Sequence, residues 1–157
     1  MKQHFTFDWR RIAGPGELLA SGLTGYATNR RDVGEMTTFW CFLCNGSTWR
    51  LESVMNDLGD WEEVGSLVFW EASEDMALPE MIQLPPQWTR IESIDKLVVQ
   101  VDEFSADSGL VLINRAGDEL TIVCGAAPYA IEVRAPFFDG DFSPEFAIER
   151  YQRVPMM

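Results

Sequence analysis

Apolar and polar residues alternate along much of this chain with the period of a β-strand. Phe5, Phe7 and Trp9 alternate with polar residues near the N-terminus, and residues 129–134 repeat the pattern. A period of two is typical of a strand with one buried face. Further runs rich in β-branched and aromatic residues predict strands at residues 37–44, 48–54, 64–70, 96–101, 110–114 and 119–124.

The clearest short-range signal is Asn45-Gly46, which separates two of these runs. This dipeptide favours the positive φ angles of a type I′ turn, so residues 37–54 predict a β-hairpin. The other connections in the first half are expected to be irregular. Residues 17–20 predict a short helical turn, residues 21–35 a loop, and residues 55–63 a loop or a short helical turn.

A helix is predicted only at the C-terminus. Ser143 offers an N-cap, and Pro144 suits the first helical position. Ala147, Tyr151 and Val154 would then share one face. We therefore expect a short C-terminal helix that packs across a sheet.

These elements predict a mainly β fold, with α+β as the alternative. Short turns join the runs between residues 96 and 134, which is typical of an antiparallel meander. We expect an antiparallel sheet, a sandwich or a partly closed barrel, with the short C-terminal helix. The 157 residues suit a single globular domain, residues 1–157, that can bury a core without disulfides.

Charge is distributed unevenly along the chain, whose formal net charge is −13. Residues 51–89 contain nine acidic residues and no Lys or Arg, and the stretch 71–87 is interrupted by three prolines. Such a surface repels phosphate backbones, which disfavours nucleic acid as a partner. It attracts basic partners, although the simplest role of a high net charge is to keep a protein soluble.

Three further features concern the environment of the chain. The N-terminal residues are charged rather than apolar, and no apolar run is long enough to span a bilayer. Three cysteines cannot all pair within one chain, which favours a reducing compartment. We therefore expect a cytoplasmic protein without a membrane partner.

Aromatic residues make up 12% of the chain and are interpreted mostly as core, with a ring platform for a sugar or nucleobase as the alternative.

The candidate chemistry is sparse. Cys41 and Cys44 have the spacing of a redox or zinc pair, but they lie where a strand enters a turn, which favours ordinary buried cysteines. His4 is the only histidine and lies near the terminus, which disfavours a Ser-His-Asp or Cys-His nucleophile. Gly-rich nucleotide-binding loops do not occur. We expect no catalytic residue, no metal and no cofactor.

The composition is similar to that of small acidic inhibitors and bacterial immunity proteins, which favours a non-enzymatic binding protein. Its partner would be a basic protein, steered by charge and held by aromatic anchors such as Trp61 and Trp70. The candidate binding residues are Asp60, Trp61, Glu62, Glu63, Trp70, Glu71, Glu74 and Asp75. Three alternatives remain: a β-barrel or sandwich that binds a small ligand among its rings, a hydrolase with two facing carboxylates, and self-association into a homo-oligomer.

Overall fold

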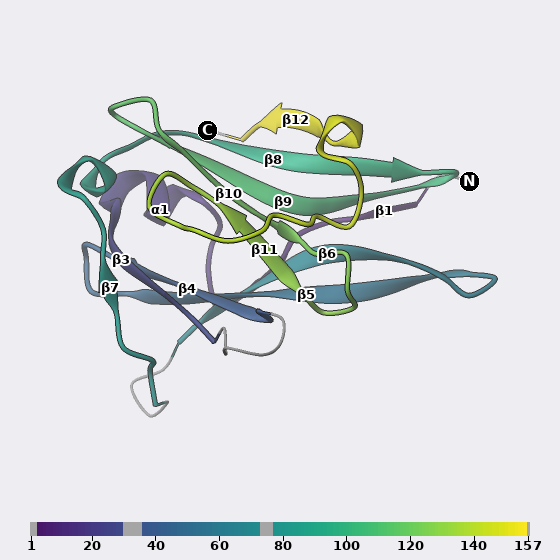
Figure 1. The fold of residues 1–157 in the computed structure, drawn as a ribbon, viewed down its shortest axis with the longest axis horizontal. Coiled ribbons are helices and arrows are strands. Elements are labelled where there is room, and N and C mark those ends of the chain that lie inside the picture. Colours follow the sequence, from purple (N-terminus) through teal and green to yellow (C-terminus); the bar gives the residue numbers. More distant parts are fainter. Residues whose placement is uncertain (1–2, 30–35, 73–76, 157) are drawn as a thin grey trace.

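The computed structural model describes residues 3–29, 36–72 and 77–156. It contains two six-stranded sheets, which form two layers in Figure 1. Apolar residues of both sheets share one core cluster, so burial between the layers holds them together. The prediction of a mainly β fold is confirmed, and among the described strands neither sheet closes into a barrel.

The first sheet is built on the predicted meander. Four successive strands pair with their neighbours in antiparallel fashion, and two distant segments complete the sheet. In pairing order the strands are β11 (Ile131–Arg134), β10 (Glu119–Cys124), β9 (Phe104–Asn114), β8 (Ile91–Val101) and β12 (Gln152–Pro155), with β1 (Gln3–Phe5) parallel to β9.

The second sheet contains the predicted hairpin and the strands on either side of it. In pairing order these are β2 (Asp8–Arg10), β6 (Glu62–Glu71), β5 (Thr48–Gly59), β4 (Thr38–Leu43), β3 (Leu23–Thr28) and β7 (Ile82–Gln83). The short helices are α1 (Gly16–Ser21), which confirms the helical turn predicted there, and the 3-10 turns η1 (Pro86–Thr89) and η2 (Ile148–Arg150). None of these described helices has the length and apolar character needed to cross a bilayer.

Aromatic side chains fill part of the space between the layers. The Trp9 ring stacks on Phe69 with centroids 4.1 Å apart, and Phe7 and Trp49 meet Phe69 edge-on at 5.1 and 6.2 Å. Offset-stacked and edge-on contacts are the arrangements that aromatic rings prefer. The interpretation of the rings as core residues holds for this cluster.

A bulge in β9 brings two neighbouring polar side chains into the interior. Leu97 pairs with Gly109 and Val98 with Asp107, so Ser108 is an extra residue in β9. Adjacent side chains of a regular strand point to opposite faces, and a bulge relaxes this alternation. Asp107 and Ser108 are consequently both buried.

Gly65 in β6 forms a close contact between the two sheets. The Ser108 hydroxyl donates to the Gly65 carbonyl at 2.6 Å, and the Gly65 N–H donates to the Glu145 carboxylate at 2.9 Å. A Cβ on Gly65 would lie 2.8 Å from the Cβ of Cys124 in β10. Only glycine therefore allows this contact without displacing the backbone.

Three expectations for the first half need correction. Residues 23–28, predicted as loop, form β3 because most residues of this segment are buried, and residues 30–35 lie outside the described part of the chain. Residues 55–59, predicted as a loop or a short helical turn, continue β5 toward the end of a long hairpin. At Asn45-Gly46 only Gly46 has a positive φ angle, of 95°, so the turn is not type I′.

The predicted C-terminal helix is wrong. Pro144 forms a bridge with Gly125, Val154 lies in β12, and only η2 is helical in this segment. Tyr151 is buried in a second apolar cluster, and its hydroxyl accepts the Phe146 N–H at 3.1 Å. Apolar burial and strand pairing outweigh the local capping signal, which is worth only about 1 kcal/mol.

We predict that Gly65→Ala destabilises the fold by about 1–3 kcal/mol, because the added methyl group overpacks the contact with Cys124. Chemical denaturation measures the loss. Cys124→Gly removes the opposing side chain, so the double variant should lose less stability than the sum of the two single variants. Strict additivity would show that the two positions do not clash.

Candidate functional site

The tip of the β5–β6 hairpin carries a fully exposed tryptophan. Figure 1 shows this hairpin extending as a narrow arm beyond the neighbouring strands. Asp60 and Trp61 form the turn with φ angles of 50° and 65°, and Trp61 is fully exposed. The left-handed conformation costs an L-residue roughly 1–2 kcal/mol, and it is rare for a bulky side chain. The tip therefore combines unfavourable backbone geometry with an unburied aromatic ring.

Acidic side chains surround this ring. Asp57 in β5 and Glu63 in β6 are directly opposite each other in the hairpin register, and Glu62 and Asp60 lie between them and Trp61 in sequence. All four are exposed. Like charges directly opposite on paired strands destabilise a sheet. We refer to residues 57–63 as the acidic tip.

The eight predicted binding residues do not form one continuous surface in the described part of the chain. Asp60, Trp61, Glu62 and Glu63 belong to the acidic tip, whereas Trp70 and Glu71 lie at the other end of β6. Trp70 is nine residues from Trp61, about 30 Å at the rise of an extended strand. Glu74 and Asp75 lie outside the described residues.

Trp70 is engaged by two cations. The guanidinium carbons of Arg10 and Arg50 lie 5.0 and 5.2 Å from the centre of its ring. Both arginines are register partners of Trp70, one from β2 and one from β5. The acidic run of the sequence is therefore interrupted here by basic residues of neighbouring strands, and the Trp70 ring already has partners within the protein.

A buried carboxylate in β9 forms a second cluster, which the sequence did not indicate. Asp107 accepts hydrogen bonds from Nε2 of His4 at 2.8 Å and from the Phe7 N–H at 3.2 Å, and its Oδ1 lies 3.2 Å from Nζ of Lys96. Nδ1 of His4 lies 2.6 Å from the Ser105 hydroxyl. Three donors compensate for the burial of this charge. His4 is thus fixed to β9 through the β1 pairing rather than lying on a mobile terminus.

The contacts of His4 resemble those of a catalytic triad. Its ring lies between the Ser105 hydroxyl, in the place of a nucleophile, and the Asp107 carboxylate, in the place of an orienting acid. His4 borders a cleft of about 350 Å³ together with Asn56 and Ser66, but Ser105 is not among the residues that line it. A nucleophile must reach its substrate, so the cleft does not complete such a site. The contacts of His4 with Ser105 and Asp107 are explained by a structural role, since they hold β1 against β9.

Cysteine and carboxylate chemistry receives little support among the described residues. Burial raises the pKa of the Cys41 and Cys124 thiols to about 12, so both remain protonated at neutral pH. Cys44 is exposed, which corrects the expectation that Cys41 and Cys44 are both buried. No group of three potential metal ligands occurs in the described ranges. The cleft beside His4 is lined by one carboxylate, Asp8, and a second, larger cleft is also lined by one, Glu17.

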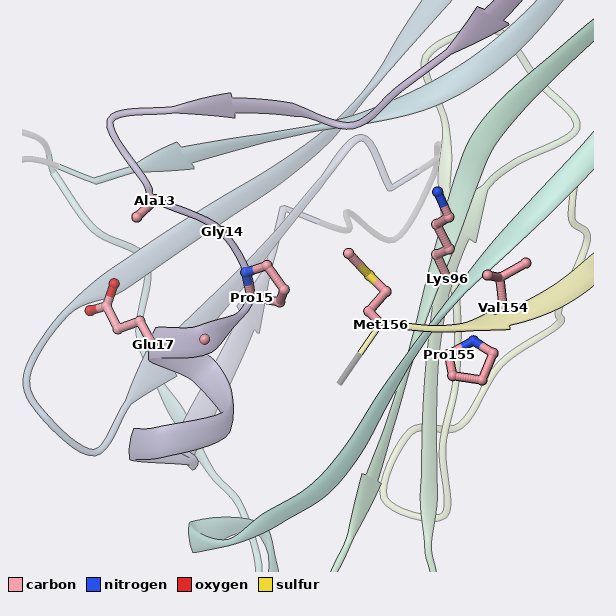
Figure 2. A pocket seen from close by; sticks show the side chains of 9 residues that line it. Ala13, Gly14, Pro15, Glu17, Lys96, Val154, Pro155 and Met156 are labelled. Carbon is pink, nitrogen blue, oxygen red and sulfur yellow. The ribbon is translucent and has the colours of Figure 1, made fainter.

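The larger cleft lies at the edge of the first sheet and measures about 680 Å³ (Figure 2). The segment that precedes and begins α1 forms one wall, and β8, β12 and the residue after β12 form the other. Its lining is Ala13, Gly14, Pro15, Gly16, Glu17, Lys96, Val154, Pro155 and Met156. None of these residues is aromatic, so the cleft is not the ring-lined ligand site considered from the sequence.

Glu145 connects the interior to the acidic tip. Burial raises its pKa, the hydrogen bond from the Gly65 N–H lowers it, and the charge of Glu63 raises it further, with a net increase above the ordinary value of 4.5. Ionisation of Glu145 is therefore less favourable in the folded protein than in the unfolded chain.

Comparisons with known proteins add no constraint. A scan against protein-family models and searches of curated proteins and of solved structures found no match.

We predict that His4→Ala lowers the free energy of unfolding by about 1–3 kcal/mol, because Asp107 loses a donor while remaining buried. Arg90→Ala is the matched control, because the Arg90–Glu92 pair is largely exposed and should contribute less than about 1 kcal/mol. Urea unfolding of both variants tests this. Equal losses would mean that Asp107 does not depend on His4.

We predict that Glu145→Gln stabilises the protein at neutral pH. Because the pKa of Glu145 is higher in the folded protein, this carboxyl group loses its proton at a lower pH in the unfolded chain. The free energy of unfolding therefore falls as pH rises above 4.5 and levels off above the pKa of Glu145 in the folded protein. The substituted amide keeps an oxygen acceptor for the Gly65 N–H but does not ionise. The difference in melting temperature between the variant and the wild type should therefore appear above pH 4.5 and vanish below it. A variant that is less stable at pH 7 would contradict this sign.

Proposed function

We propose that the protein is a non-enzymatic binding protein that captures a basic protein partner with the acidic tip. The observation that carries this proposal is the exposure of Trp61 in a left-handed turn. Strained residues persist where the surrounding structure holds them, and they cluster at functional sites. Tryptophan is also among the residue types most enriched among dominant binding residues.

The charges around Trp61 specify the chemistry of the partner. Asp57, Asp60, Glu62 and Glu63 are exposed, and the stretch 51–89 contains no Lys or Arg to neutralise them. A cationic partner would relieve the repulsion between Asp57 and Glu63 and would be steered by the net charge of −13. Trp61 would then be buried against the partner, while the acids form the polar rim.

The position of the tip supports the same role. Val64, which follows the acidic tip, is fully buried, and Gly65 is hydrogen-bonded to both β9 and the C-terminal segment. The base of the arm is therefore fixed while its end is exposed. A preorganised binding element loses less conformational entropy on association than a mobile loop does.

Trp61→Gly should separate stability from binding. Glycine adopts a positive φ angle without strain, and an Asp-Gly pair at this turn matches the preference of a tight hairpin. We expect the free energy of unfolding to rise by up to about 1 kcal/mol, equivalent to a melting temperature about 2–4 °C higher. Capture of the partner should be lost in the same variant. A variant that is less stable than the wild type would show that Trp61 is held by contacts within the fold.

The functional test is affinity capture at low and at high salt, with identification of the bound proteins. The wild type should retain a basic protein at low salt that Trp61→Gly and Glu63→Lys do not retain. Glu149→Lys changes the net charge equally at an exposed position in η2 and should behave as the wild type. Retention of the same protein by both tip variants would refute the proposed site.

A further inference from the structure

The cleft between the α1 segment and β12 has the size and the lining of a small-molecule site. Its volume of about 680 Å³ lies within the range of about 300–1,000 Å³ that is usual for ligand pockets. Pro15 forms one apolar wall, and Val154, Pro155 and Met156 form the other, with Figure 2 showing the Met156 side chain between Pro15 and Lys96. An elongated apolar group can therefore contact both walls.

Two charged side chains of opposite sign border this apolar space. Figure 2 shows the Glu17 carboxylate directed away from Lys96 and Met156. Its Oε1 accepts a hydrogen bond from the Asn45 amide at 3.0 Å, which lowers the pKa of Glu17. Glu17 is thus engaged with the turn between β4 and β5, and Lys96 is the charged group on the opposite wall.

Lys96 is partly withdrawn from solvent, with 26% of its side chain exposed. Its ammonium lies 3.2 Å from Asp107, a contact that uses one of its three N–H donors. Asp107 also accepts from His4 and from the Phe7 N–H, so its charge does not depend on Lys96 alone. Lys96 can therefore meet a second anion without leaving Asp107 unpaired.

We propose that this cleft binds a small amphiphile with an unbranched apolar chain and a carboxylate head, with the chain between Pro15 and Met156 and the head on the ammonium of Lys96. The site is separate from the acidic tip and does not rest on the proposed partner binding. The hydrogen bonds formed by a carboxylate and an ammonium are stronger than neutral ones, which selects this head group over an alcohol.

The net charge of the protein allows specific binding of a carboxylate amphiphile to be distinguished from non-specific adsorption. A chain with a formal charge of −13 repels anions over its surface as a whole and attracts cations. Non-specific adsorption would therefore favour a cationic amphiphile. A preference for a carboxylate would therefore point to a local cation, and Lys96 is the positively charged residue of the lining.

The test is calorimetric titration of the full chain with three probes that share one alkyl chain: decanoate, decan-1-ol and decyltrimethylammonium, each below its aggregation concentration. We expect decanoate to bind saturably to one site, at least about tenfold more tightly than the alcohol. The ammonium probe should not displace it. Absence of saturable decanoate binding, or equal affinity for the acid and the alcohol, would overturn the proposal without any variant.

Variants assign the site to the cleft. Lys96→Met should lower the affinity for decanoate to that for the alcohol, whereas Arg115→Met removes an equal charge at an exposed position outside the cleft and should change neither. Met156→Ala should weaken both probes by a similar factor, and it leaves the Lys96–Asp107 pair intact in case Lys96→Met does not fold. Trp61→Gly should bind decanoate as the wild type does. A Lys96→Met protein that folds and keeps the preference for decanoate would place the site elsewhere.

Discussion

The close contact between the two sheets at Gly65 is the constraint on which the rest of the structure depends. A residue without a side chain lets β6 approach Cys124, and its backbone groups bond to Ser108 and Glu145. These bonds satisfy the Gly65 N–H and carbonyl on the side of β6 where β2 does not pair with this residue. The contact also lies next to the boundary of the acidic tip, because β6 is buried from Val64 to Phe69 and exposed before Val64.

The bulge that supplies Ser108 to this contact also supplies Asp107 to the neighbouring polar cluster. One irregularity in β9 therefore joins three segments: the hairpin through Gly65, the N-terminal segment through His4 and Phe7, and β8 through Lys96. Both proposed binding surfaces depend on it, since it fixes the base of the acidic tip and holds the ammonium of Lys96, a residue that lines the larger cleft.

The acidic tip carries features that reduce local stability, namely a left-handed tryptophan and two opposed carboxylates. The anchored base of the hairpin compensates for these costs within the fold. Conflicts between local preference and global structure are concentrated where proteins act rather than where they are merely folded. The combination of a left-handed, exposed tryptophan with opposed carboxylates, rather than net charge alone, distinguishes residues 57–63 from the other acidic residues of the chain.

Local sequence patterns predicted the meander, the hairpin strands and the acidic residues around Trp61, because each of these features depends on residues that are close together in the sequence. The distal half of the hairpin was missed because its residues lack the alternation of buried and exposed positions that identifies a strand. The Asp107 cluster was missed because its pairing joins residues about a hundred positions apart. The interruption of the acidic run by Arg10 and Arg50 likewise depends on strand order, which local patterns do not reveal.

We have proposed that the acidic tip is the surface that meets the partner. Amide hydrogen exchange of the protein, free and in complex with the captured basic protein, tests it most directly. We expect slower exchange in residues 57–63 on binding, with little change in β8 and β12 beside the larger cleft. Protection of another surface, with exchange at the tip unchanged, would contradict the claim.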